Sequence, residues 1–158
     1  MWLYNPVMDV LATNNKARFN YDLQDKFEAG ISLNGAEVKS VKRGNLQIRE
    51  SYVKITKSGE AHLHNAYIAP YSHAGNKDYN PYRTRKLLLR AEELSEIAAK
   101  THGSNLTIVP IKVYNTSRGL IKLEIALARG KKQYEKRREI TKRDIKKEIK
   151  GTLKKYHS

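Results

Sequence analysis

Two groups of residues have the types and spacing that catalysis or metal binding could use, but both have simpler explanations. Glu92, Glu93 and Glu96 resemble a paired-carboxylate site, yet acids in the first turn of a helix also stabilise its dipole. His62 and His64 would lie on one face of a strand, but no carboxylate or third histidine stands at metal-ligand spacing from them. The chain also has no phosphate-binding glycine loop and no nucleophile elbow. The sequence therefore predicts no catalytic residue, no metal and no cofactor.

A third group has the chemistry of nucleic-acid binding. In the segment from Gly130 to Arg137, four cations surround the single ring of Tyr134. Cations can hold phosphates while an aromatic ring stacks on a base. We assign to this segment Gly130, Lys131, Lys132, Tyr134, Lys136 and Arg137. From composition alone, a solvated disordered tail explains the segment equally well.

The charge of the chain points to the same partner. Lysine and arginine number 31 against 16 acids, a net charge of +15, and such an excess attracts polyanions by releasing their counterions. The last 30 residues, from Arg129, contain 13 basic and 4 acidic residues. The chain has no cysteine, no run long enough to cross a bilayer and no secretory signal at its start. We therefore expect a cytoplasmic protein that binds nucleic acid and does not contact a membrane.

Smaller clusters have RNA-binding character when they are taken together. Arg83, Arg85 and Lys86 directly precede three leucines, which puts a positive edge beside a core element. A second cluster at the end of a predicted helix consists of Lys39, Lys42 and Arg43, although the helix dipole alone explains such cations equally well. Amide and ring groups suited to sugars and stacked bases are Asn45, Tyr52, Asn65 and Tyr67.

The elements that must hold these residues are mostly strands. Apolar residues alternate over residues 18–33, 46–56, 60–70, 106–114 and 120–128, and residues 87–89 form a short apolar run. Turn residues at 57–59 and 117–119 predict two hairpins, and 71–84 is expected to be a loop. Short helices are predicted at 34–42, where Asn34 and Glu37 form a capping box, and at 91–100. We predict a mainly β fold with short helices, an antiparallel β-barrel of the oligonucleotide-binding (OB) type.

The chain divides into three parts. Residues 1–14 show no period and are expected to form a loose or weakly docked leader, residues 15–129 the barrel, and residues 130–158 the basic tail. In the tail, Ile145, Ile149, Leu153 and Tyr156 fall on one narrow stripe at helical spacing. Because lysines and arginines cover the rest, we expect a helix that forms conditionally, on binding RNA.

Several motifs together resemble one family. In chain order they are Asn15-Lys16-Ala17, Phe27-Glu28-Ala29-Gly30-Ile31, Glu37-Val38-Lys39-Ser40, Glu50-Ser51-Tyr52, Arg83-Thr84-Arg85-Lys86-Leu87-Leu88-Leu89, and Gly130-Lys131-Lys132 followed by Lys136-Arg137. This order resembles the SsrA-binding protein family, also called small protein B, from about Asn15 to the C-terminus. The motif residues Asn15, Lys16 and Gly30 join the expected RNA-binding set on this ground.

The resemblance implies a function. By this resemblance, the chain is expected to bind the tRNA-like domain of transfer-messenger RNA (tmRNA) with an OB-like barrel and to deliver it to stalled bacterial ribosomes. This process is called trans-translation. The residues that matter for this RNA in the family fall here on Glu28, Leu88 and Lys122. A glutamate can accept hydrogen bonds from base amines or hold a basic neighbour, although a structural salt bridge also explains it.

The family tail is implied to occupy the empty mRNA path near the decoding centre of the small subunit. Tyr134 stands where many members have histidine, so it keeps a stacking ring but lacks the imidazole. Glu135 replaces an aspartate. Alternatives from other classes remain, namely a structural ribosomal protein with a basic extension and an enzyme acting on RNA. We expect the chain to act as a monomer.

Overall fold

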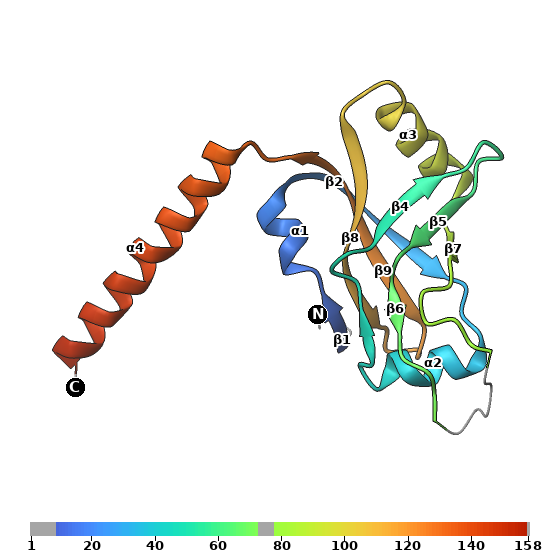
Figure 1. The fold of residues 1–158 in the computed structure, drawn as a ribbon, viewed down its shortest axis with the longest axis horizontal. Helices are drawn as coiled ribbons and strands as arrows, with labels where there is room; N and C mark the ends of the chain where they lie inside the picture. Colours follow the sequence, from blue (N-terminus) through green and yellow to red (C-terminus); the bar gives the residue numbers. More distant parts are fainter. Residues whose placement is uncertain (1–8, 73–77, 158) are drawn as a thin grey trace, which may run out of the picture.

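The computed structural model describes residues 9–72 and 78–157 (Figure 1). Its strands are β1 (Asp9–Thr13), β2 (Tyr21–Ile31), β3 (Leu46–Gln47), β4 (Tyr52–Ile55), β5 (Ala61–His64), β6 (Tyr67–Ile68), β7 (Arg85–Leu88), β8 (Leu106–Asn115) and β9 (Ile121–Gly130). Its helices are α1 (Asn15–Asn20), α2 (Gly35–Lys42), α3 (Ala91–Thr101) and α4 (Gln133–His157).

The main sheet is antiparallel and curls on itself. Its strands follow the order β1-β8-β4-β5-β7-β2-β9, and β9 also pairs with β8. The pairing between β4 and β8 rests on a single residue pair, Val53 with Ile108. The predicted mainly β, antiparallel fold is confirmed, but the barrel is not clearly closed along this seam. In Figure 1, α2 and α3 lie at opposite ends of the curled sheet.

The core is built from alternating strand residues. Strand residues such as Leu63, Leu87, Leu123 and Ile125 point inward and are almost fully buried. Burying each such side chain contributes roughly 1.5–3 kcal/mol. A smaller apolar cluster on the outer face of β8 and β9 lies against α1 and contains Ala17, Val109, Ile111, Ala126 and Ala128.

The predicted helices and turns are confirmed. The Asn34 side chain accepts a hydrogen bond from the Glu37 N–H at 2.8 Å, and the Asn34 N–H donates to the Glu37 carboxylate at 3.1 Å, which completes the capping box. The helix predicted at 91–100 is α3. Both hairpin turns contain a glycine with positive φ, +85° at Gly59 and +79° at Gly119, a conformation that other residues rarely adopt.

Three predicted strands are shorter than expected. Residues 18–20 end the helix α1 instead of starting a strand, because Asn14 caps that helix by accepting a hydrogen bond from the Ala17 N–H at 3.1 Å. The runs 46–56 and 60–70 are each interrupted, and β3 and β6 form a separate two-stranded sheet. The interruptions coincide with Ser51, which bonds back to the Ile48 carbonyl at 2.6 Å, and with Asn65, at φ +63°.

The expectation of a loose leader does not fit residues 9–14. Residues 9–13 form β1, which pairs with β8, and the buried Asn14 side chain donates to the Ile48 and Pro110 carbonyls at 3.1 and 2.9 Å. These backbone and amide hydrogen bonds fix the segment although its sequence has no clear period. Residues 1–8 of the predicted leader and 73–77 of the predicted loop lie outside the described residues. The described remainder of that loop contains no strand or helix.

The tail is a helix of 25 residues that projects away from the sheet (Figure 1). Ile145 and Ile149 of the predicted stripe are exposed on it. The side chains of Leu153 and Tyr156 lie outside the described part. That the helix forms only on RNA stays a prediction. In the part of the chain that the structure describes, no helix has the length and apolar character needed to cross a membrane.

Candidate nucleic-acid interface

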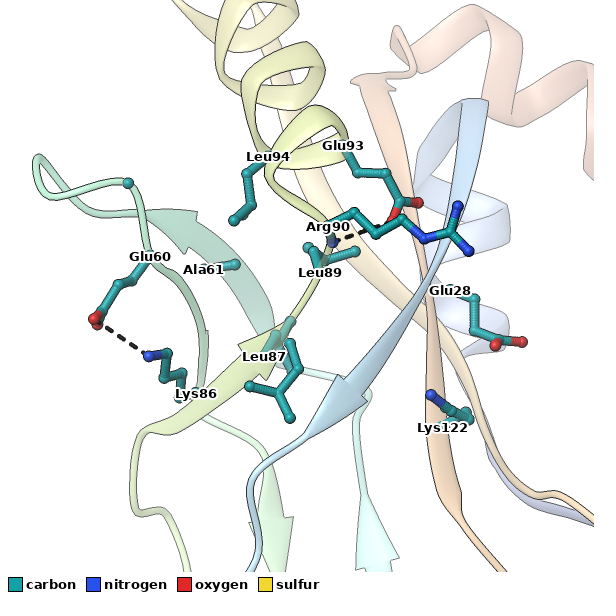
Figure 2. A pocket seen from close by; sticks show the side chains of 12 residues that line it. Glu28, Glu60, Ala61, Lys86, Leu87, Leu89, Arg90, Glu93, Leu94 and Lys122 are labelled. Carbon is teal, nitrogen blue, oxygen red and sulfur yellow. Dashed lines mark hydrogen bonds and ion pairs between the residues drawn. The ribbon is translucent and has the colours of Figure 1, made fainter. Parts of the chain in front are cut away.

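A groove lies where β2, β7 and β9 meet the start of α3 (Figure 2). Its volume is about 650 Å³. Glu28 enters it from β2, Leu88 from β7 and Lys122 from β9. These three residues are 94 positions apart along the chain at their extremes, and only the pairing of β2 with both β7 and β9 brings them together. The groove is therefore the first candidate for the RNA-binding surface.

Leu88 is an exposed apolar residue in this groove. On β7 the side chains alternate, so Leu87 is buried while Leu88 remains 56% exposed. Leu88 pairs with Gly30 on β2, and a Cβ on Gly30 would lie only 3.3 Å from the Leu88 Cβ. Glycine thus leaves room for Leu88 beside the groove. An exposed leucine among polar groups is suited to packing against a sugar or the face of a base.

Glu28 has a neutral partner. Its carboxylate accepts a hydrogen bond from the Tyr114 hydroxyl on β8, and it forms no ion pair within the described residues. The salt-bridge explanation considered for Glu28 is therefore not supported. The neighbouring Glu124 differs, because it has ion pairs with Lys26 at 3.6 Å and with Lys112 at 3.3 Å.

The lysines of the groove are only partly held in ion pairs within the protein. Lys86 pairs with Glu60 at 3.3 Å, drawn as a dashed line in Figure 2, and both side chains are about half exposed. Such an exposed pair is worth little and can exchange for a phosphate. Figure 2 shows Lys122 near Glu28, and within the described chain Lys122 has no ion-pair partner. A phosphate or a sugar oxygen can therefore approach Lys122 without displacing a carboxylate.

Arg85 is wrongly assigned to the RNA-binding surface. It points inward with Leu87 and is fully buried, with hydrogen bonds to the Ala66 and Pro81 carbonyls at 2.8 and 3.0 Å. Its guanidinium also pairs with the buried Glu37 carboxylate. The period of two along β7 could have revealed this, since Arg85 shares the parity of the buried Leu87. Arg85 is a structural residue that joins β7 to α2.

Glu37 links several elements. Besides Arg85, its carboxylate accepts hydrogen bonds from Arg83 at 2.5 Å and from the Tyr79 hydroxyl at 3.1 Å. Burial by itself would raise the pKa of Glu37, but the hydrogen bonds from Arg83, the Asn34 N–H and Arg85 outweigh it and hold that pKa below its ordinary value. Arg83 is therefore only partly available to RNA, with its side chain half exposed.

A second group of predicted residues lies at the end of α2. Lys39, Lys42 and Arg43 are exposed there, and Asn45 follows them. The Lys39 ammonium and the Arg43 guanidinium lie 5.3 and 5.0 Å from the centre of the Tyr71 ring. These distances fit cation–π contacts, which keep the charges at the surface. None of these cations lines the groove. If they bind RNA, they form a second contact surface at the end of α2.

A third group surrounds Glu50. Asn15 and Lys16 begin α1, and the Lys16 ammonium pairs with the Glu50 carboxylate. The Asn65 amide donates to the Glu50 carbonyl at 3.2 Å. Tyr52 stacks on His64, with the ring centres 5.3 Å apart and the planes 12° from parallel.

Tyr67 lies beside this group. It contacts Tyr82 with ring centres 5.3 Å apart, and both rings line a hollow that includes Asn65 and Glu50. Apart from the buried Arg85 and the half-exposed Arg83, the predicted RNA-binding residues of the sheet and its helices fall on three surfaces rather than one.

The base of the tail is attached to the barrel. Gly130 ends β9, and the Lys131 ammonium pairs with Glu139 and donates to the Arg18 carbonyl at 3.3 Å, so that its side chain is mostly buried. Arg129 pairs with Glu135 at 3.1 Å. The other tail residues of the motif, Lys132, Tyr134, Lys136 and Arg137, stand on or beside the first turns of α4 and are exposed or half exposed.

Glu93 and Glu96 of the carboxylate group, and His62 of the histidine pair, have structural partners. The Glu93 carboxylate accepts from the Arg90 N–H at 3.3 Å, and Glu96 pairs with Lys100 at 2.8 Å, so both stabilise α3. His62 contacts Glu60 at 3.1 Å. Across residues 9–72 and 78–157 there is no group of three or more potential metal ligands.

Sequence reasoning missed two residues that organise these surfaces. Asn14 falls within the predicted leader, and its only signal is that asparagine is a common residue at the start of a helix. Tyr114 ends the strand predicted at 106–114, and no local signal marks its contact with Glu28. Both contacts join segments far apart in the sequence.

Comparisons of the sequence and of the structure with known proteins all indicate the same family. Residues 11–155 match the family model described as SmpB protein. The SsrA-binding protein of Persephonella marina is 48% identical over 140 residues, which cover 89% of this chain and 91% of that protein. The SsrA-binding protein of Rubrobacter xylanophilus is 45% identical over 147 residues, which cover 93% and 97%. A solved structure described as "tmRNA-SmpB: a journey to the center of the bacterial ribosome" has a TM-score of 0.65 at 45% identity, covering 82% of this chain and 90% of its own.

Proposed function

The chain belongs to the SmpB protein family, and from this premise we propose that it binds tmRNA and delivers it to bacterial ribosomes in trans-translation. Its partners are tmRNA and the ribosome. The observation that supports this function best is the meeting of Glu28, Leu88 and Lys122 in one groove.

We propose that this groove binds the tRNA-like domain of tmRNA. A cation, a carboxylate with free acceptor positions and an exposed leucine can respectively meet a phosphate, a base amine and an apolar face. Of the residues predicted from sequence, Gly30 and Lys86 support the groove from β2 and β7. The cations at the end of α2 and the residues around Glu50 provide further polar surfaces for the same RNA or for the ribosome.

The test is direct binding of a transcript of the tRNA-like domain. We expect Glu28→Ala and Lys122→Ala each to weaken binding about tenfold or more, whereas Lys57→Ala, in the exposed turn between β4 and β5, has little effect. Lys122→Ala should also reduce the slope of log affinity against log salt by about one, because one phosphate contact is lost. Full affinity in both groove variants would contradict the assignment.

The rival function is that of a structural ribosomal protein. It predicts stoichiometric retention on ribosomes after high-salt washes, and no enrichment of a single RNA. Sequencing the RNA that copurifies with the chain separates the two, since the proposed function requires one dominant tRNA-like species.

We propose further that α4 enters the vacant mRNA path of the small subunit near the decoding centre. A helix whose exposed charged residues are mostly basic fits a channel lined by RNA phosphates. In this proposal Lys132, Tyr134 and Arg137 contact the ribosome, and the chain acts as a monomer without catalysing a reaction. Its place of action is the cytoplasm, where ribosomes are found.

A further inference from the structure

Glu28 on β2 and Tyr114 on β8 both lie on the outer face of the sheet, with β9 between their strands. Glu28 is opposite Glu124, and Lys122 is opposite both Gly30 and Tyr114. Because paired residues share a face, and so do residues two apart on one strand, all of these side chains project from one surface. The Tyr114 side chain therefore reaches diagonally across β9 to the Glu28 carboxylate.

Tyr114 is held firmly in this position. It is only 3% exposed, and the Lys112 ammonium lies 5.8 Å from the centre of its ring. Its hydroxyl donates to the Glu28 carboxylate. Burial, together with this hydrogen bond and the charges of Glu28 and Glu124, raises the pKa of Tyr114 far above its ordinary value of 10.0. The hydroxyl thus remains protonated and remains a donor throughout the neutral range.

The neutrality of this partner matters for the carboxylate. Two lysines bind Glu124 and offset its charge, whereas Glu28 receives one hydrogen bond from an uncharged phenol. A carboxylate has about four acceptor positions, so Glu28 keeps most of its capacity to accept hydrogen bonds. A hydrogen bond to one oxygen also restricts the rotamers of an otherwise exposed side chain.

From this geometry we infer that Tyr114 is a positioning residue, which fixes the Glu28 carboxylate in the orientation that accepts hydrogen bonds from base amino groups of the bound RNA. The inference rests on the proposed function, because it assumes that the groove binds the tRNA-like domain. Tyr114 itself does not line the groove and acts through Glu28.

The test is a double-mutant cycle on RNA affinity. Tyr114→Phe removes only the hydroxyl, and we expect it to weaken binding of the tRNA-like transcript about fivefold to tenfold, because Glu28 must then be ordered on binding. In a Glu28→Ala background the same substitution should change the affinity by less than about twofold. Tyr21→Phe is the matched control, since the Tyr21 hydroxyl on β2 makes no hydrogen bond within the described residues.

The outcomes separate the inference from the function it rests on. Thermal unfolding of each variant shows whether Tyr114→Phe alters the fold, and a purely structural role would lower the melting temperature without coupling to Glu28. Wild-type affinity in Tyr114→Phe, or an equal loss with and without Glu28, would overturn the inference while the function stands. If the wild-type chain failed to bind the transcript, the proposed function itself would fall.

Discussion

Arg85 on β7 donates two hydrogen bonds, from Nε and Nη2, to a single carboxylate oxygen of Glu37 on α2, at 2.9 and 2.6 Å. Both side chains are completely buried. A strand that lines the proposed RNA-binding groove is thereby joined to a helix at the other end of the sheet (Figure 1). Arg85 belongs to a motif that the resemblance associates with RNA, but its buried position assigns it to the support of that surface.

The first prediction concerns the contribution of this ion pair to the stability of the folded protein. Arg85→Ala should lower the free energy of unfolding by about 3–5 kcal/mol, because it leaves the Glu37 carboxylate without its buried partner. Lys86→Ala is the control on the same strand, and it should cost less than about 1 kcal/mol because its ion pair is exposed. Urea unfolding at neutral pH measures both. A loss in Arg85→Ala no larger than that in Lys86→Ala would contradict the structural role.

The second prediction concerns acid stability. The pKa of Glu37 is lower in the folded chain than its ordinary value of 4.5, so the folded state favours the ionised carboxylate. This stabilisation is fully present above about pH 4.5 and is lost as the pH falls through the lowered pKa. Glu37→Gln should be less stable than wild type at neutral pH, and the gap should narrow in acid. Urea unfolding over a pH series checks this, and a gap that stays constant would contradict it.

The third prediction concerns the space beside Leu88. Gly30→Ala adds a Cβ that would lie 3.3 Å from the Leu88 Cβ, so β2 and β7 must shift or Leu88 must move. We expect affinity for the tRNA-like transcript to fall about tenfold, or about 1.4 kcal/mol. Gly35→Ala is the matched control, because a Cβ there would meet nothing within 4 Å. Equal affinity of the two variants in a filter-binding or fluorescence titration would contradict this reason for the glycine.

The fourth prediction separates the barrel from the tail. A chain that ends at Lys132 keeps β9 and the contact of Lys131 with α1 but lacks α4. We expect it to bind the tRNA-like transcript within about threefold of wild type, while tagging of stalled peptides in a reconstituted translation system is lost. The helix-keeping variant Tyr134→Ala tests the ring alone. If truncation abolished RNA binding and tagging together, the assignment of RNA binding to the barrel and of tagging to the tail would be wrong.

Most of the architecture can be predicted from the sequence because it depends on local rules. The capping box at Asn34 and Glu37, the two glycine turns and the period of two along β8 and β9 each act within a few residues. The errors occur where tertiary contacts prevail. Asn14 and residues 9–13 have no period, yet hydrogen bonds to distant carbonyls and the pairing with β8 fix them in place.

The sequence by itself determined the excess of positive charge, the basic tail and the identity of the family, because composition and ordered motifs are properties of the chain alone. Only the tertiary structure decided which motif residues are exposed in the groove and which are buried beneath it. The pleat of β7 turns Arg85 inward and Leu88 outward, and the pairing of β2 with β7 and β9 gathers Glu28, Leu88 and Lys122 in one groove. The hydrogen bond from Tyr114 to Glu28 spans 86 positions, so no local pattern could have indicated it.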